Sequence, residues 1–317
     1  MSHPVVVVTE GSAPGPLVWL CGRAEVLEVG LADPALPAAL ARADGLIVRT
    51  YTKVTREFLA GCPKLRVVGR GGVGLENIDI PACRERGIEV VYTPAANTIA
   101  VGDFVFGAVI RLIRPWAEFS EKAYAPAEFK KVRDALRGRQ LDEMTLGVLG
   151  MGRVGRRVGR IGANGFGMRV LFHDIEPVEQ REPLAFPAER VPMERLLSES
   201  DVFTIHTDMR EGNHHLIGAA ELSQMKKSAV LVNYARGELL DAAALAAALR
   251  QGQLAAAAID VFDPEPPPAD FPLLGLPNVL LTPHMAARTN TAIENMSWVV
   301  RDVDRVLRGE KAEWPAP

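Results

Sequence analysis

The chain has few cysteines and no long apolar run, and each absence excludes a class of protein. Its 317 residues include only three cysteines, Cys21, Cys62 and Cys83. Their spacing contains no CxxC or Cys/His pattern, which argues against a zinc site or a disulfide framework and favours a reducing compartment. No stretch approaches the run of about 20 apolar residues that a membrane span needs. We therefore expect a cytoplasmic protein that does not bind membranes.

The chain also lacks an excess of charge of either sign. Lysine and arginine number 36 and the acidic residues 39, which gives a formal net charge of −3. A balanced surface does not attract polyanions, so nucleic acid is not an expected partner. With 48% hydrophobic residues and 28 glycines, the composition is typical of a globular protein. The length suggests two domains.

Short apolar runs alternate with longer helical patterns, which is typical of βα units on a parallel sheet. A first series of strand-like runs covers residues 45–50, 65–72 and 87–93. A second series covers residues 145–150, 168–174, 201–207, 228–235, 255–260 and 278–284. Six runs are enough for a doubly wound sheet, so we predict an α/β protein with two such sheets.

Helical patterns separate the two series and end the chain. The first runs from Thr98 to Ile113, and the charged stretch after it, residues 128–143, is interpreted as a solvated connection. The last pattern, residues 290–309, carries apolar residues at helical spacing. Because it follows the completed second sheet, we expect it to pack on the first domain and to make that domain discontinuous.

The segment VLGMGRVG places Gly150, Gly152 and Gly155 in a GxGxxG pattern between a strand-like run and a helical one. By itself the spacing also fits a packing turn. In this context Gly150 permits a tight turn, Gly152 lets the backbone approach a pyrophosphate, and Gly155 allows helix and strand to pack closely. Unpaired N–H groups at the helix start then face the anion. Arg153 lies inside the same loop and is placed to reach the pyrophosphate.

Asp174 ends the next strand-like run, nineteen residues after Gly155. A dinucleotide site needs an acid there to hydrogen-bond a ribose diol. A carboxylate repels a 2′-phosphate, and the following Ile175 and Glu176 supply no arginine to bind one. The predicted cofactor is therefore NAD and not NADP.

Three side chains near the ends of late strand-like runs have the chemistry that a hydride transfer needs, namely Arg236, Glu265 and His284. The reaction requires a proton donor for the developing alkoxide and a cation for an anionic substrate. A carboxylate beside an imidazole favours its protonated form and fixes its orientation, and an arginine offers a planar fork to a carboxylate. Singly, His284 also fits a structural histidine and Glu265 a turn residue.

The sequence resembles the D-isomer-specific 2-hydroxyacid dehydrogenases from about Asp44 to Arg305. The resemblance rests on five segments in order, VGRGGVGLENIDI, VLGMGRVG, VLVNYARGELLD, AIDVFDPEP and NVLLTPH. It implies a Rossmann NAD-binding domain, residues 98–287, inserted into a flavodoxin-like substrate domain, residues 1–97 plus 288–317. It also implies a homodimer, and at 317 residues we expect the short form without the regulatory domain of some members.

The resemblance further implies roles for individual residues. Arg236 binds the substrate, Glu265 orients His284, and His284 is the acid/base. The implied cofactor contacts beyond the glycine loop and Asp174 are Val154, Thr207, Asp208, Ala235, Asp260 and Ala287. Asp208 and Ala286 replace the proline and glycine that are usual in the family. No metal is implied, and His214 and His215 are interpreted as a loop feature without metal partners.

The expected substrate is a small 2-oxo or 2-hydroxy acid. The resemblance places its carboxylate on the backbone of Val73 and Gly74, in a loop that forms a nest of N–H groups. Within the family the segments look most like the D-3-phosphoglycerate dehydrogenases of serine biosynthesis, where arginines matching Arg49 and Arg70 hold a phosphate. The alternative is that both arginines cap strand ends or pair with acids such as Glu76.

Other functions stay open at this point. One alternative is a reductase of another 2-oxoacid, such as glyoxylate or hydroxypyruvate. An alternative of another class is an NADH-sensing protein that resembles a corepressor, because the same fold serves such regulators. A phosphite-oxidising relative is a further option, whereas the formate enzymes carry glutamine in place of Glu265.

Overall fold

The computed structural model describes four stretches of chain, residues 3–114, 126–178, 182–210 and 212–317. The chain divides into two compact units, one formed by Met1–Asn97 with Ala287–Pro317 and the other by Thr98–Ala286. The first unit is thus discontinuous in sequence. Ala287, assigned from the sequence to the inserted domain, lies in the first unit.

The first unit contains a parallel five-stranded sheet in the order β2-β1-β3-β4-β5. Its strands are β1 (Val5–Val8), β2 (Glu25–Glu28), β3 (Gly45–Val48), β4 (Val67–Arg70) and β5 (Glu89–Tyr92). This is the flavodoxin-like order, so the predicted fold of this unit is confirmed. The order reverses at β1 and β3, and ligands of such sheets bind at the carboxyl ends of the strands beside that point.

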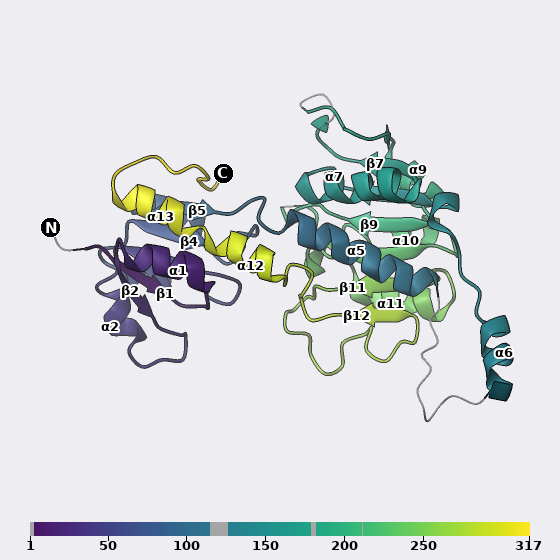
Figure 1. The fold of residues 1–317 in the computed structure, drawn as a ribbon, viewed down its shortest axis with the longest axis horizontal. Helices are drawn as coiled ribbons and strands as arrows, with labels where there is room; N and C mark the ends of the chain where they lie inside the picture. The colour runs from purple at the N-terminus through teal and green to yellow at the C-terminus, as the bar shows by residue number, and fades with distance from the viewer. Residues whose placement is uncertain (1–2, 115–125, 179–181, 211) are drawn as a thin grey trace. The chain divides into compact units, whose positions relative to one another are not determined.

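Helices cover both faces of this sheet (Figure 1). One face packs against α1 (Pro14–Cys21) and α13 (Val300–Leu307), and α12 (Asn290–Ser297) precedes α13. The other face packs against α2 (Leu36–Leu40), α3 (Arg56–Ala60) and α4 (Ile80–Glu85).

The last helical segment packs on the first unit, as predicted. A Cβ atom at Gly69 would lie 2.5 Å from Val303 Cγ2, so α13 packs directly on β4. The segment forms two helices and not one, because the helical backbone is interrupted at Trp298 and Val299.

The second unit contains a parallel seven-stranded sheet in the order β12-β11-β10-β9-β6-β7-β8. Its strands are β6 (Thr145–Leu149), β7 (Arg169–His173), β8 (Glu189–Arg190), β9 (Val202–Ile205), β10 (Val230–Asn233), β11 (Ala256–Ile259) and β12 (Val279–Leu281). The order is that of a Rossmann sheet with one added strand, and it reverses between β6 and β9. The second doubly wound sheet is therefore confirmed.

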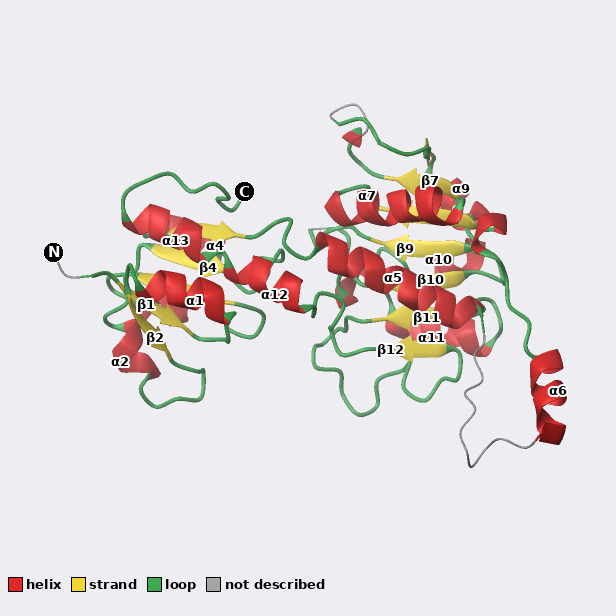
Figure 2. Cartoon of the chain, viewed as in Figure 1, coloured by secondary structure: helices red, strands yellow, loops and turns green. Residues whose placement is uncertain are grey.

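Two layers of helices enclose this sheet (Figures 1 and 2). One face carries α5 (Thr98–Ile113) beside α7 (Arg153–Arg160). The other carries α9 (Met193–Glu199), α10 (Ala219–Gln224) and α11 (Ala242–Arg250), whose leucines pack with the apolar residues of the sheet. Shorter turns are the 3-10 helices Leu141–Glu143 and Gly237–Leu239 and the π-helix Ile161–Gly165.

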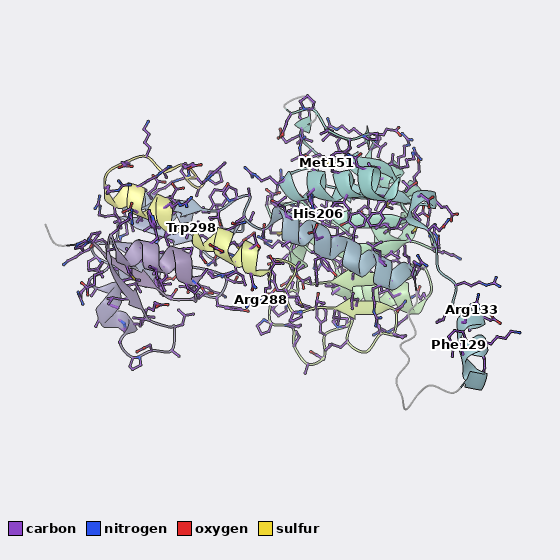
Figure 3. All side chains as sticks on the ribbon, viewed as in Figure 1. Phe129, Arg133, Met151, His206, Arg288 and Trp298 are labelled. Atoms are coloured by element: carbon purple, nitrogen blue, oxygen red, sulfur yellow. The ribbon has the colours of Figure 1, made fainter. Side chains whose placement is uncertain are left out.

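The charged stretch after α5, residues 128–143, differs from the prediction, because the helix α6 (Pro126–Ala135) covers its first half. A proline suits the first helical position, and the residues from 127 to 135 include neither glycine nor proline. Phe129 is exposed on this helix (Figure 3). Among the described residues, no helix combines the length and the hydropathy that crossing a bilayer would require.

Candidate active site

His284 and Glu265 form the centre of the candidate site. His284 follows β12 and Glu265 follows the neighbouring strand β11, and His284 Nδ1 lies 2.7 Å from Glu265 Oε1. With Nδ1 donating to the carboxylate, Nε2 is the nitrogen left to exchange a proton with a substrate. His284 has φ +48°, a left-handed conformation that is uncommon for a side chain of this size. The surrounding loop therefore has to hold the imidazole in place.

Asp260 holds that loop. It is buried at the end of β11, and its Oδ1 accepts hydrogen bonds from Thr282 Oγ1 at 2.6 Å and from the Met285 N–H at 2.8 Å. Its Oδ2 accepts one from the Ala286 N–H at 2.8 Å. Burial raises the pKa of the Asp260 carboxyl, although these donors act in the opposite direction. The carboxyl thus ties together the residues on both sides of His284, a role that the sequence analysis missed.

Arg236 lies in a tight turn after β10, the neighbour of β11. Asn233 is fully buried and shapes this turn, because its Nδ2 donates to the Arg236 carbonyl at 2.8 Å and its Oδ1 accepts from the Ala235 N–H at 3.1 Å. A Cβ atom at Gly237 would lie 2.1 Å from the Phe262 carbonyl carbon, so the chain beyond Arg236 packs directly against the loop that carries Glu265.

The glycine-rich loop has the geometry that its motif predicts. Gly150 has φ +89°, and a Cβ atom there would lie 2.8 Å from His206 backbone atoms. A Cβ atom at Gly155 would lie 2.0 Å from the Gly150 oxygen, so neither position accepts a side chain. Gly152 is the N-cap of α7 and has no atom within 4 Å of its Cβ direction. No side chain caps the helix there. Arg153 and Val154 start its first turn, whose N–H groups suit an anion.

Asp174 follows β7 and lies beside this loop. Its Oδ2 accepts from the Met151 N–H at 2.7 Å, and its Oδ1 accepts from the Glu176 N–H at 2.9 Å. A carboxylate has about four acceptor sites, so each oxygen keeps capacity for a ribose hydroxyl. The open space at Gly152, where no described atom lies within 4 Å of a Cβ built on that residue, and this acid together fit a dinucleotide.

Asp208 is paired within its own loop. Its Oδ1 lies 2.6 Å from Arg210 Nη2 and 3.3 Å from Thr207 Oγ1. Arg210 therefore compensates the negative charge of Asp208, a residue that the resemblance singles out as unusual. The pair is exposed, so its own contribution to stability is small.

His206 is unsuited to compete with His284 as a proton donor. Its Nε2 lies 2.8 Å from Thr204 Oγ1, and burial lowers its pKa to about 3. The imidazole is therefore neutral at pH 7, which suits a structural role.

In the first unit, Glu10 organises the loop that carries Arg49. Glu10 follows β1, and its carboxylate accepts hydrogen bonds from four successive N–H groups, of residues 49 to 52, at 2.9–3.2 Å. Asn77 supports the same loop, because its Nδ2 donates to the carbonyls of Arg49 at 2.9 Å and Thr52 at 2.7 Å. Neither residue was identified from the sequence.

Arg49 interacts electrostatically with a second cation that the sequence analysis missed, Arg288. Arg288 precedes α12 and is labelled in Figure 3. Burial and the guanidinium of Arg288 lower the pKa of Arg49, while Glu10 acts in the opposite direction. Two neighbouring guanidinium groups repel each other, and an anion between them relieves that repulsion. Arg49 and Arg288 thus place two positive charges in the same part of the first unit.

The loop after β4 carries the remaining predicted substrate residues. Arg70 folds back over its own loop and donates from Nη1 to the Gly71 carbonyl at 2.8 Å. Gly72 has φ +154° and passes so close to the Arg70 guanidinium that a Cβ atom would clash with it. Within the described residues, no hydrogen bond uses the N–H group of Val73 or Gly74. The described protein thus uses neither group as a donor, at half-buried Val73 and buried Gly74.

A family profile described as "D-isomer specific 2-hydroxyacid dehydrogenase, NAD binding domain" matches residues 106–286. The chain is 40% identical over 297 residues to a D-3-phosphoglycerate dehydrogenase of Methanocaldococcus jannaschii, a match that covers 92% of this chain and 55% of that protein. It thus spans about half the length of that relative. The chain belongs to the D-isomer-specific 2-hydroxyacid dehydrogenase family.

Other relatives of this 2-hydroxyacid dehydrogenase act on different acids by name. It is 38% identical to a glyoxylate/hydroxypyruvate reductase B of Yersinia enterocolitica, covering 84% of this chain and 81% of that one. It is 39% identical to an (S)-sulfolactate dehydrogenase of Chromohalobacter salexigens, covering 84% and 85%. The family is therefore established, and the substrate is not.

Solved structures agree with this family assignment. The TT0316 protein of Thermus thermophilus matches with a TM-score of 0.86 and 33% identity over 99% of this chain and 100% of that one. A D-lactate dehydrogenase of Aquifex aeolicus, solved with NAD and lactic acid, matches with a TM-score of 0.79 and 27% identity over 96% of each chain. As a member of the family, this chain is an oxidoreductase with NAD as its cofactor.

Glu10 gives this dehydrogenase a testable pH dependence. We expect Glu10→Gln to lower the free energy of unfolding by about 1–3 kcal/mol, because an amide presents an NH₂ group to backbone donors. Burial raises the pKa of Glu10, but the N–H groups of the 49–52 loop outweigh it and hold the pKa below its ordinary value of 4.5. The stabilisation is therefore present above pH 4.5 and disappears as the pH falls through the lower, folded-state pKa.

Urea denaturation of the parent and of Glu10→Gln from pH 7 downwards measures this effect. The two curves should converge below pH 4.5. Glu28→Gln changes an exposed acid of the same unit and should show no such convergence. A stability difference that persists unchanged at acid pH would contradict the role of the carboxylate.

Proposed function

We propose that the chain interconverts a 2-oxoacid and a D-2-hydroxyacid with NAD, and that its substrate pair is 3-phosphohydroxypyruvate and 3-phosphoglycerate. The observation that carries the reaction is the 2.7 Å contact between His284 Nδ1 and Glu265 Oε1, at the carboxyl edge of the NAD-binding sheet. An imidazole held by a carboxylate, with its other nitrogen available, is an acid/base suited to alcohol and ketone chemistry.

Each residue has a defined task in this proposal. NADH, when bound, supplies the hydride to C2 of the oxoacid. His284 donates a proton from Nε2 to the ketone oxygen, and Glu265 stabilises the protonated ring at Nδ1. Arg236 binds the substrate carboxylate with its planar fork and polarises the neighbouring carbonyl. Val73 and Gly74 bind the carboxylate through their N–H groups.

The cofactor contacts follow the same proposal. Gly150, Gly152, Arg153, Val154 and Gly155 surround the pyrophosphate, and Asp174 binds the adenosine ribose. The remaining proposed contacts with the cofactor are those of Thr207, Asp208, Ala235, Asp260 and Ala287. Asp260 acts in addition through the loop of His284, where its hydrogen bonds are already made.

Support for a substrate with a second anionic group comes from the first unit. Arg49 and Arg288 interact electrostatically, and we propose that they bind the phosphate together with Arg70. A sulfonate is also anionic, so the relative named (S)-sulfolactate dehydrogenase makes 3-sulfopyruvate a second candidate. Glyoxylate and hydroxypyruvate carry no such group, and they are the alternative that the relative named glyoxylate/hydroxypyruvate reductase suggests.

NADH oxidation with a panel of oxoacids tests the substrate. The panel contains 3-phosphohydroxypyruvate, 3-sulfopyruvate, hydroxypyruvate, glyoxylate and pyruvate. We expect the phosphorylated acid to have the highest kcat/KM, and Arg49→Gln to lower that value about 10- to 100-fold, the effect of losing a charge-assisted hydrogen bond. Activity with pyruvate should be nearly unchanged in this variant.

Arg42→Gln is the matched control, because Arg42 forms an exposed ion pair with Glu25 in the same unit. A preference for an unphosphorylated acid, or an equal loss on every substrate in Arg49→Gln, would contradict the phosphate site while leaving the reaction type intact. Negligible turnover on the whole panel would favour the NADH-sensing or phosphite-oxidising alternatives.

The cellular setting belongs to the same proposal. We propose that the enzyme acts in the cytoplasm, as a homodimer, and in serine biosynthesis if the phosphorylated acid is its substrate. The free thiols of Cys21, Cys62 and Cys83 support a reducing compartment.

A further inference from the structure

Two histidines and an aspartate from a different loop lie together on the surface of the second unit. His214 and His215 follow β9, and Asp263 follows β11. One potential ligand atom from each lies within 4.8 Å of the others. His214 Nε2 is 3.5 Å from Asp263 Oδ2, and the two imidazole rings stack with centroids 4.0 Å apart. The fold therefore supplies the third group that the sequence did not indicate for these histidines.

The backbone holds the two loops in register. The His215 N–H donates to the Glu238 carbonyl at 2.7 Å, and His215 has φ +52°. A Cβ atom at the neighbouring Gly237 would lie 2.6 Å from the Asp263 nitrogen. Both loops thus rest on the same short segment, and the left-handed conformation turns the His215 side chain away from the course of a regular strand or helix. The cluster follows from backbone packing and not from its own side-chain contacts.

The surroundings of the cluster favour a cation. His215 and Asp263 line a cavity of about 340 Å³ whose other acidic residues are Asp241 and Asp270. None of the lining residues in the described chain is a lysine or an arginine. Negative groups raise the local concentration of cations, and the nearby Arg250 uses Nη2 to donate to the carbonyl of Pro272, a lining residue, at 3.0 Å.

We propose that His214, His215 and Asp263 bind a divalent transition-metal ion of the Zn²⁺ type. Imidazole nitrogen and carboxylate oxygen together suit zinc, nickel and copper, whereas magnesium and calcium prefer oxygen alone. Ligand atoms on a tetrahedral zinc lie about 3.4 Å apart at bond lengths of about 2.1 Å. The imidazole planes are 26° apart as they stack, so one ring has to turn out of the stack before both nitrogens face one ion. Three protein ligands leave one position to water.

The bound ion would connect the loop after β9 to the loop that carries Glu265. Asp263 lies two residues before Glu265, so the ion restrains the segment that orients His284. Binding to the folded state alone also stabilises it by mass action. This site is separate from the hydride-transfer chemistry, and its test does not depend on the proposed substrate.

Titration of the EDTA-treated enzyme with Zn²⁺, followed by calorimetry, tests the proposal, and Co²⁺ absorbance reports the ligand geometry. We expect one ion per chain on this cluster and a higher Tm with Zn²⁺. His214→Gln should weaken binding by about tenfold or more, since even changes around a ligand cost about 10- to 100-fold. His3→Gln, which alters an exposed histidine of the first unit, should not.

Two further measurements keep the result decisive. Zn²⁺ affinity should fall with falling pH, because the ligands must lose their protons to bind. If His214→Gln does not fold, Asp263→Asn replaces it, and the loss of affinity is expected there too. Equal Zn²⁺ affinity in the parent and in a folded ligand variant, or no saturable binding up to about millimolar Zn²⁺, would overturn the proposal.

Discussion

Replacing His284 with alanine should lower kcat for oxoacid reduction by about 10²- to 10⁴-fold, the usual contribution of a positioned general acid. In the structure His284 Nδ1 lies 2.7 Å from Glu265 Oε1, so only Nε2 is left to serve the substrate. Without the ring, water has to protonate the developing alkoxide. Single-turnover measurement of NADH oxidation at saturating substrate reports this loss directly.

The backbone of His284 decides which control is informative. Its φ of +48° strains an alanine, so His284→Ala combines a lost proton donor with a distorted loop. Asparagine tolerates this conformation better. We therefore expect His284→Asn to fold, to bind NADH with an affinity close to that of the parent, and to lose turnover nearly as completely. Activity of His284→Asn within about tenfold of the parent would contradict the role of the imidazole.

Glu265→Gln should give an intermediate result. The amide keeps a hydrogen bond to Nδ1 but removes the charge that stabilises the protonated ring. The loss in turnover should thus be smaller than in His284→Asn. Steady-state measurement of kcat in the two variants and the parent tests this order.

The parts of the site that could be predicted from the sequence are those whose chemistry is local. Gly150 and Gly155 belong to one short motif, and the structure shows why a Cβ is excluded at both. Arg236, Glu265 and His284 each follow a strongly apolar run, and the carboxyl ends of parallel strands meet at one edge of the sheet. The order of the strands in the sheet then brings these three positions together, so no additional sequence motif is needed to predict that they are close.

The parts that were missed depend on contacts across long stretches of sequence. Glu10 accepts hydrogen bonds from a loop about forty residues away, and nothing near it in the sequence marks that partner. The sequence shows Asp260 only as an acid at the end of a strand. Its three hydrogen-bond donors from the His284 loop are known only from the fold. Arg288 could not be identified as a functional candidate from the sequence, because only the fold shows that its charge acts on Arg49.

The sequence analysis missed the strands β1, β2 and β8 for a different reason. β2 and β8 lie at sheet edges and are built from Glu25–Glu28 and Glu189–Arg190, so they lack the apolar runs that mark buried parallel strands. β1 is apolar, but a run of four valines is too short for periodicity to distinguish a buried strand from other apolar segments. Its place in the centre of the first sheet follows from pairing with β2 and β3.

Arg236→Gln should lower kcat/KM by about 10²- to 10⁴-fold. A bidentate contact with the substrate carboxylate comprises two charge-assisted hydrogen bonds, each contributing about 1.5–3 kcal/mol. The fold should be largely unaffected, because the turn is held by Asn233 Nδ2 donating to the Arg236 carbonyl, and the side chain adds a hydrogen bond from Nη1 to the carbonyl of the adjacent Ala235 at 2.6 Å. Steady-state kinetics against oxoacid concentration, together with circular dichroism, separates the two effects.

Lysine at position 236 separates the contribution of the planar guanidinium donors from that of the positive charge alone. Arg236→Lys keeps a cation but loses the planar pair of donors, so its loss should be about 10- to 100-fold, between those of the parent and Arg236→Gln. KM for the oxoacid should rise in both variants. Because Arg236 also polarises the reacting carbonyl, kcat should fall as well. Arg160→Gln, an exposed arginine at the end of α7, is the control and should leave both constants nearly unchanged. Equal activity of Arg236→Lys and the parent would show that a point charge suffices and that the fork has no part in recognition.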